Sequence, residues 1–447
     1  MLPETHLRFV YYEQDLRRPN KSYMKKIIVS AGLLVAGAGV LQAANTSDLS
    51  QMEQSKWWSI SAFLRGFYDD NVATAPSPAA GQPSRIQNSF GTELGPTLGV
   101  NWKGNQLTLV GAYQGTFKYN EHQDFTQLNH LLSLKADESF SPKYRLTLSE
   151  RFAVAQDPQI LEPGVISNPH STLLRSSQSG INNMVNAKFS DQITDTMGAD
   201  VGYDNTIYDY EQHGIGSLGA ILNRMEQAGS ANLRWQVMNQ TTAVFGYKFQ
   251  DVDYTSKDPL FTGGPTGKIR NNQSHFLMAG VDQMFTSQLS GSARVGAQII
   301  DYYNAPGTPT KVSPYADASL SYQYASGSSA QVGIRHQHIA TDTASGSATN
   351  PVLDSEATAV YASVTHKFTG KLNANGVAQF QHSDYNGGGP GFDNKRADFY
   401  LLNLNLSYQY NPHISSEVGW NYSNLGSQLA GWSYDRNVFY LGVRATY

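Results

Sequence analysis

The sequence predicts an all-β protein, a transmembrane antiparallel up-and-down β-barrel of about 18 strands, with about 16 as the alternative count. Three observations lead to this fold class: apolar and polar residues alternate along most of the chain, tight turns alternate with long loops, and charge is scarce. Of 447 residues, 40% are hydrophobic and 15% are charged, against about 25% charged residues in an average soluble domain. Uncharged polar residues therefore occupy positions that Lys and Glu fill elsewhere.

The composition also excludes several classes of protein. A mean hydropathy of −0.41 is too low for a bundle of membrane-spanning helices, each of which needs about 20 nearly unbroken apolar residues. The absence of Cys excludes a disulfide scaffold, a thiolate metal site and a lipidated N-terminal Cys. A net charge of −4 argues against nucleic acid as a partner. No cofactor and no metal are expected.

The N-terminal region predicts export. An apolar run from Ile27 to Leu41 follows Met24-Lys25-Lys26 and precedes Gln42-Ala43-Ala44. This order is typical of a secretory signal peptide, and a membrane anchor is the alternative. We expect Met24 to be the true start. The expected divisions are an N-terminal extension (1–23), a signal peptide (24–43), a short periplasmic segment (44–56) and the barrel (57–447).

Alternation at period two is clearest in the last segment, which is typical of a strand with one apolar and one polar face. Its two faces carry Phe439, Leu441, Val443, Ala445 and Tyr447 on one side and Tyr440, Gly442, Arg444 and Thr446 on the other. The same split recurs over 107–113, 233–237, 293–299, 316–322, 330–334 and 400–410. Nothing in these segments predicts a helix.

Turn residues divide the segments into hairpins of two kinds. Short connections contain Gly104, Pro142, Asp191, Asn239, Ser287, Gly327, Gly370 and Pro412. Longer loops occupy 71–87, 120–125, 157–177, 209–220, 254–270, 303–311, 342–355, 384–395 and 425–435. Their strict alternation predicts an even strand count, with both ends of the barrel on the tight-turn side.

The apolar faces are expected to point outward. They end in aromatic residues such as Tyr113, Trp235 and Trp420, as interfacial aromatic girdles do. About 18 strands also enclose a lumen too wide for side chains to fill. Lipid outside and water inside resolve both observations, and closure pairs every backbone amide, as hydrocarbon requires.

The inward faces are expected to carry charges of both signs. The period assigns to the lumen Arg65, Lys135, Arg145, Arg151, Lys188, Arg234, Lys248, Arg294, Arg335, Arg444, Glu93, Asp200, Asp282 and Asp317. An excess of bases across a wet lumen favours anions mildly. Ion pairs that only hold the wall together are an equally good interpretation.

The loop 157–177 is expected to form a constriction. It carries Asp157, Glu162 and Arg175 but is too apolar to extend into water. Folding into the lumen would cover it; packing on a neighbouring protomer or on the rim is the alternative. The long loops also carry many acids, among them Asp69 and Asp157, which could gather cations or could be solvated charges.

Enzyme motifs are weak, and no catalytic residue is expected. Residues 214–219 match G-x-G-x-x-G, but a strand follows and no βαβ unit surrounds them. His336 and His338 could hold a metal, although alternation places them on the lipid side near a strand end, where an interfacial histidine is the simpler explanation.

Two stretches carry a resemblance. The last strand, ending in Tyr447, is similar to the signal read by barrel-assembly machinery. The stretch from Leu222 to Tyr254 resembles the putative β-barrel porin family of Gram-negative outer-membrane proteins. The resemblance implies the bacterial cell outer membrane and transport.

Together these observations favour a porin-like channel for passive diffusion of small hydrophilic solutes. The alternatives are an exopolysaccharide export barrel and a surface adhesin or structural barrel. Expected partners are outer-membrane lipid and lipopolysaccharide, small hydrophilic solutes, the barrel-assembly machinery and, as a homotrimer, further copies of the chain.

Overall fold

The computed structural model describes residues 56–76, 86–121, 125–161, 168–171, 173, 179–344, 346–347, 350–389, 391–429 and 431–447. The expected N-terminal extension and signal peptide lie outside the described residues, so these divisions stay predictions.

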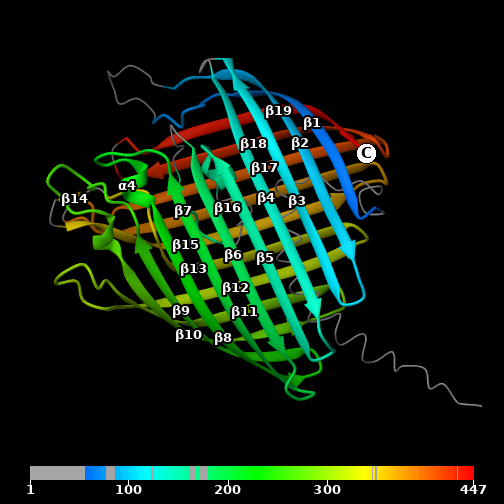
Figure 1. Cartoon of the computed structure of the whole chain (residues 1–447), viewed down its shortest axis with the longest axis horizontal. Helices are drawn as coiled ribbons and strands as arrows, with labels where there is room; N and C mark the ends of the chain where they lie inside the picture. The colour runs from blue at the N-terminus through cyan, green and yellow to red at the C-terminus, as the bar shows by residue number, and fades with distance from the viewer. Residues whose placement is uncertain are drawn as a thin grey trace, which may run out of the picture.

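The strands form one antiparallel sheet that closes on itself (Figure 1). They are β1 (Trp58–Asp69), β2 (Ser89–Lys103), β3 (Leu107–Asn120), β4 (Phe125–Ser139), β5 (Tyr144–Ala155), β6 (Gly180–Asp191), β7 (Met197–Tyr210), β8 (Arg224–Met238), β9 (Thr241–Tyr254), β10 (Asn272–Met284), β11 (Leu289–Asp301), β12 (Lys311–Ala325), β13 (Ser328–Ile339), β14 (Gly346–Ser347), β15 (Asn350–Lys367), β16 (Leu372–Gly387), β17 (Arg396–Asn411), β18 (Ile414–Ser427) and β19 (Tyr434–Thr446).

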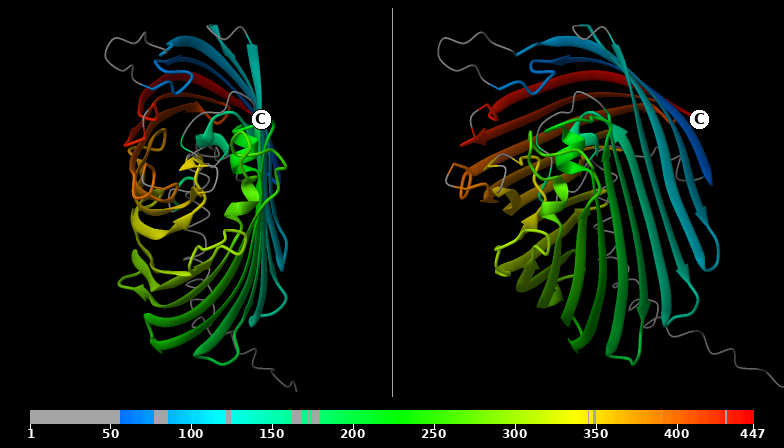
Figure 2. Two further views of the ribbon diagram at one scale, coloured as in Figure 1. Left: turned by 90° about the vertical axis from the view of Figure 1, so that its left-hand side faces the viewer. Right: turned by 60° about the vertical axis from the view of Figure 1, so that its left-hand side comes forward.

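Of the 19 strands, β14 pairs only with β15. The other 18 form the wall, and β1 closes it by pairing with both β2 and β19. The predicted fold class and the larger strand count are thus confirmed. Each strand pairs with its neighbours in the chain, so tight turns gather at one end of the barrel and long loops at the other (Figure 2).

Short helices occur in the long loops, where the sequence predicted none. They are α3 (Pro158–Leu161), α4 (Leu218–Leu222) and the 3₁₀ helix η2 (Gly267–Arg270). In α4 the Ser217 hydroxyl accepts a hydrogen bond from the backbone N–H of Ala220 at 3.0 Å, which caps the helix N-terminus. None of the helices in the described ranges is long and apolar enough to cross a membrane.

Burial alternates along the strands as the period predicts. In β1, Ile60 and Leu64 are about half exposed on the outer face, whereas Ser61 and Phe63 are buried on the inner face. In β19, Leu441 and Val443 are exposed, whereas Gly442 and Arg444, which alternate with them, are buried. The outer face is therefore apolar and suited to acyl chains, and the inner face carries the polar residues.

Some aromatic rings on the inner wall lie over glycines of the next strand. Phe63 is opposite Gly95, and Tyr440 is opposite Gly419. A Cβ at Gly95 would lie 2.1 Å from the Phe63 ring, and one at Gly419 would lie 2.1 Å from the Tyr440 ring. Only glycine permits this close approach, so both rings rest against the wall instead of projecting across the lumen.

Candidate functional site: the lumen and its constriction

The lumen residues that the sequence singled out all occupy inward positions of their strands. A first group surrounds Arg65, which lies 2.6 Å from Glu417 and 3.7 Å from Glu93. Its guanidinium also lies over Phe63, 4.4 Å from the ring centroid. Arg65 and Glu417 are 352 residues apart in the chain, and the closure of β1 on β19 brings them together. We define Arg65, Glu93 and Glu417 as the Arg65 cluster.

Two further groups place one carboxylate between two bases. The first joins Lys135 and Arg145 to Asp137, at 3.2 and 3.0 Å. The second joins Lys188 and Arg234 to Asp200, at 3.2 and 3.1 Å. In each group the charged residues come from adjacent strands, where side chains on one face are neighbours.

Simple pairs complete the charged wall. Arg294 lies 2.7 Å from Asp282, and Arg335 pairs with Asp317, directly opposite it in register. Such pairs hold neighbouring strands together, and their bases are already engaged.

The remaining predicted bases have other partners. Arg444 donates to the Ser61 hydroxyl at 3.3 Å, and Arg151 donates to the Ile160 carbonyl at 3.3 Å. Lys248 lies over the Phe276 ring, 3.8 Å from its centroid. These contacts of the three bases are thus with a hydroxyl, a backbone carbonyl and an aromatic ring.

Residues 168–171 and 173 of the β5–β6 loop, which we call segment 168–173, bind the wall across the lumen at β16. The His170 N–H donates to Gln381 Oε1 at 2.6 Å, and Gln381 Nε2 donates back to the His170 carbonyl at 3.1 Å. Gln379 Nε2 donates to the Asn168 carbonyl at 3.0 Å, and its Oε1 is 2.8 Å from His170 Nε2. Two inward glutamines of β16 thus bind this segment much as a neighbouring strand would.

Other strands hold the same segment. Arg224 on β8 donates to the Ser171 hydroxyl at 3.0 Å, and the Tyr434 hydroxyl on β19 donates to the Leu173 carbonyl at 2.9 Å. The Leu173 N–H donates to Asp342 at 2.8 Å. Contacts to well-separated strands fix the segment inside the barrel.

The prediction that the acidic loop residues are solvated charges is wrong for Asp69 and Asp157. Asp69 has no exposed surface, and Arg436 binds both Asp69 and Asp157, each at 2.8 Å. A buried guanidinium requires such carboxylates, so these acids balance Arg436 and do not face water. Glu162 and Arg175 lie outside the described residues.

Arg270 of η2 joins the loops above the lumen. It is fully buried and donates to the carbonyls of Ile221 at 2.9 Å, Thr341 at 2.7 Å and Leu353 at 3.1 Å. Burial lowers the pKa of Arg270, but an arginine starts so high that it stays charged. One side chain therefore ties α4, the segment after β13 and the start of β15 together.

A cavity of about 350 Å³ lies inside the barrel beside residues 168–171. Its charged lining residues are Arg151, Arg224, Lys248, Arg335, Asp204, Glu226 and Asp354. Amides, hydroxyls and histidines supply most of the rest, including Asn182, Gln250, Ser274, Gln298, His170 and His338. A polar cavity at this point can bind and pass hydrophilic solutes.

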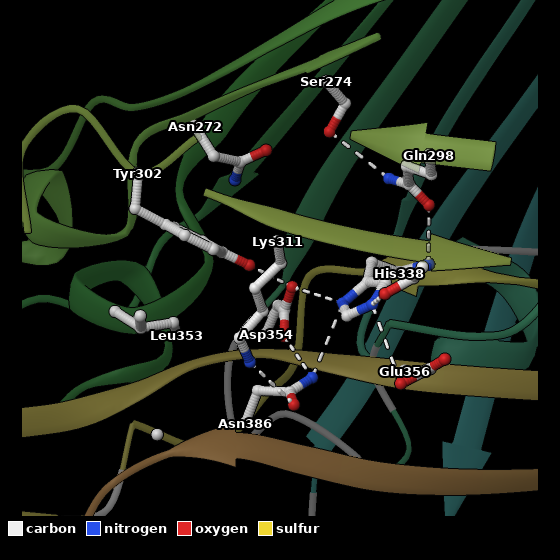
Figure 3. A network of polar contacts seen from close by, with 12 residues as sticks. Asn272, Ser274, Gln298, Tyr302, Lys311, His338, Leu353, Asp354, Glu356 and Asn386 are labelled. Carbon is white, nitrogen blue, oxygen red and sulfur yellow. Dashed lines mark hydrogen bonds and ion pairs between the residues drawn. The ribbon is translucent and has the colours of Figure 1, made fainter. Parts of the chain in front are cut away.

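A polar network borders this cavity (Figure 3). His338 Nδ1 lies 2.8 Å from Asp354, whose carboxylate also accepts hydrogen bonds from Tyr302 and, at 2.6 Å, from Asn386. Burial and the Asp354 carboxylate raise the pKa of Tyr302 well above its usual range, so its hydroxyl stays protonated and donates.

The lipid-side interpretation of His338 is wrong. The side chain is 3% exposed, and its backbone N–H donates to the inward Gln298 at 3.0 Å. The pairing of β13 with β12 ends at His336, while its pairing with β15 continues to Ile339, so the end of β13 is held by a neighbouring strand on one side only. His336 itself binds Thr358 and Glu356 at 2.8 and 3.0 Å.

Ser313, His338 and Asp354 follow the order of a serine hydrolase triad. Ser313 Oγ is 2.7 Å from His338 Nε2, but Ser313 does not line the cavity. In the described part of the chain, no three His, Asp or Glu side chains gather as a metal site. The arrangement is that of a buried supporting network.

Three residues that bind the inner loops, Gln379, Gln381 and Arg270, could not be predicted from the sequence. Alternation places the two glutamines on an inward face, but nothing local marks a glutamine that binds another segment. Arg270 lies in a loop, where no period applies.

A family model and several solved structures are similar to this chain. The chain matches the family model described as "Putative beta-barrel porin 2" over residues 61–447. No curated protein matches it. Similar solved structures include Pseudomonas aeruginosa OpdK with vanillate, 10% identical, with a TM-score of 0.42 and coverage of 87% of this chain and 98% of that one.

Two others are P. aeruginosa OccK2 (OpdF) in complex with glucuronate and Acinetobacter baumannii OccAB3. Both are 11% identical to this chain, with TM-scores of 0.42 and 0.40. Each covers 87% of this chain, and the matches span 98% and 99% of those chains. The family model spans nearly the whole barrel, which confirms the resemblance. The chain belongs to the putative beta-barrel porin 2 family and is a bacterial outer-membrane β-barrel, whose family and fold point to a channel rather than an enzyme.

Proposed function

We propose that the barrel passes small hydrophilic solutes by diffusion, and that segment 168–173 with the facing wall sets the narrowest part of the path. The observation that carries this proposal is the bonding of His170 to Gln379 and Gln381 across the lumen. A segment fixed there leaves a polar cavity of about 350 Å³, which suits small solutes better than a polymer chain. This favours diffusion over polysaccharide export.

We infer a mild preference for anions at this constriction. The cavity is lined by Arg151, Arg224, Lys248 and Arg335 against the acids Asp204, Glu226 and Asp354. Elsewhere in the lumen, bases such as Arg234 and Arg294 are bound to carboxylates. Ion selection therefore falls to the cavity, and the paired wall serves mainly as structure.

Planar bilayers test this proposal. Purified, heat-modifiable protein should give stepwise conductance, and the reversal potential in a KCl gradient should indicate chloride preference. Silent bilayers would refute a channel, and cation preference would refute the charge assignment.

We also propose that the chain has no catalytic activity. The support is that Ser313 does not line the cavity and that Asp354 is shared with Tyr302 and Asn386. Hydrolysis of short-chain nitrophenyl esters should not differ between the wild type and Ser313→Ala; a serine-dependent rate would overturn this.

The partners are proposed as follows. Tyr447 is the signal for the barrel-assembly machinery; it is 66% exposed, and its deletion should lower the amount of folded barrel in the outer membrane. Lipopolysaccharide contacts the loop end, and the barrel assembles as a homotrimer, which chemical cross-linking in the membrane would test.

A further inference from the structure

We propose that the cavity contains a binding subsite for a small hydroxylated carboxylate, with the carboxylate held by the Lys248 ammonium. The proposal rests on the proposed function, because it names the solute class for the same constriction. It is supported by the contacts of Lys248, by the contacts of the cavity acids and by the polar groups that surround them.

Lys248 has unused bonding capacity. Its side chain lines the cavity, yet within the described residues its ammonium makes no hydrogen bond and no ion pair. Its position is set by the Phe276 ring, directly opposite in register and 3.8 Å away. An ammonium has three donors, and an anion that accepts from them forms charge-assisted hydrogen bonds.

The acids of the cavity are already occupied. Asp204 accepts a hydrogen bond from Asn186. Glu226 accepts from Arg224 at 2.7 Å and from Gln250 at 3.2 Å. Asp354 is held by the network around His338. Asn186 is neutral, so Asp204 keeps its negative charge. Lys248 is the base of the cavity that forms no ion pair and no hydrogen bond among the described residues, so its ammonium is the group open to an anionic solute.

Uncharged groups favour hydroxyls on the solute. Asn182 lines the same cavity and is 2% exposed, and neither its Oδ1 nor its Nδ2 has a hydrogen-bond partner among the residues that the structure describes. An amide that both donates and accepts matches a hydroxyl, which does the same. Ser274 on β10, the strand next to that of Lys248, and Gln298 on β11 line the cavity too. The volume of about 350 Å³ is that of a small-molecule site.

Isothermal titration calorimetry on the folded protein in detergent tests the subsite without requiring conductance. The probes are gluconate, sorbitol as the uncharged polyol, acetate as the carboxylate without hydroxyls, and inorganic phosphate. Gluconate should bind saturably and at least about tenfold more tightly than each of the others.

Lys248→Met should weaken gluconate binding about tenfold or more, and Lys248→Arg should retain most of it. Lys188→Met is the matched control, since Lys188 also faces the lumen but is bound to Asp200 and does not line the cavity. It should leave gluconate binding within about twofold of the wild type.

Several outcomes would overturn the subsite. Equal affinity for gluconate and sorbitol would exclude a charge anchor, and equal affinity for gluconate and phosphate would exclude the hydroxylated carboxylate. An equal effect of the two Met variants would exclude Lys248 as the anchor. If Lys248→Met fails to fold, the wild-type comparison of the four probes still decides. Silent bilayers with intact gluconate binding would refute the channel and leave the subsite standing.

Discussion

Arg65 and Lys248 have similar surroundings on the lumen wall but differ in their ion pairs. Both are bases on inward strand positions that lie against an aromatic ring, Phe63 in one case and Phe276 in the other. Arg65 is also bound to Glu93 and Glu417, whereas Lys248 has no carboxylate within ion-pair distance in the described residues. A paired base strengthens the barrel, and an unpaired one is available to a solute. Facing the lumen is therefore not enough to make a residue selective.

The largest expected effect is on stability, from Arg65→Met. Glu417 is nearly buried, so loss of its partner leaves an uncompensated charge that costs about 3–5 kcal/mol. Urea unfolding followed by heat-modifiable gel mobility measures this cost. Ion selectivity should hardly change. A change in selectivity as large as that caused by Lys248→Met would show that a paired base and an unpaired base select ions equally.

Arg270→Met should come next, because it removes donors from three buried carbonyls. Loss of these three hydrogen bonds should cost about 1 kcal/mol each, and the joined loops should loosen. We expect faster proteolysis of the loop end and noisier single-channel currents. Unchanged noise would show that Arg270 does not hold the constriction.

The double variant Gln379→Leu, Gln381→Leu should release segment 168–173 from β16. Loss of these four hydrogen bonds, at about 1 kcal/mol each, should raise the ratio of open to constricted lumen by up to about a thousandfold. Single-channel conductance should rise, while Asn375→Leu, on the same inward face of β16 and with no hydrogen-bond partner for its Oδ1 in the described residues, should leave it unchanged. Conductance at the wild-type level would place the narrowest point elsewhere.

The smallest expected effect is that of Asp200→Asn. It frees Lys188 and Arg234, and should convert a paired part of the wall into one that attracts anions. We expect the chloride to potassium permeability ratio to rise about twofold, as for a partly solvated charge. The reversal potential in a KCl gradient measures it, and a shift towards cations would contradict the scheme.

Much of the fold follows from the sequence because alternation is a local property. Each strand shows its lumen face without reference to its neighbours, so the charged inward residues and the closed 18-stranded wall could be predicted. Partners could not be predicted, because they depend on register and closure. Nothing near Arg65 in the chain indicates Glu417.

Alternation fails where a strand stops pairing. His338 turns inward after β13 leaves β12, and β15 has a register shift between Val352 and Asp354. The period continues in the sequence there, while the pairing with one neighbouring strand ends or shifts. Both residues belong to the network beside the cavity, so the sequence was least informative where the candidate site is built.

The pairing of β1 with β19 has a consequence for biogenesis. Ser61 meets Thr446, and Asp69 meets Val438, so the first strand has no second neighbour until the last one has been synthesised. A chain that stops short of residue 434 would keep two open strand edges, along β1 and β18, with their amides unsatisfied in lipid. Insertion is thus coupled to completion of translation, and a truncated product should be left to periplasmic proteases.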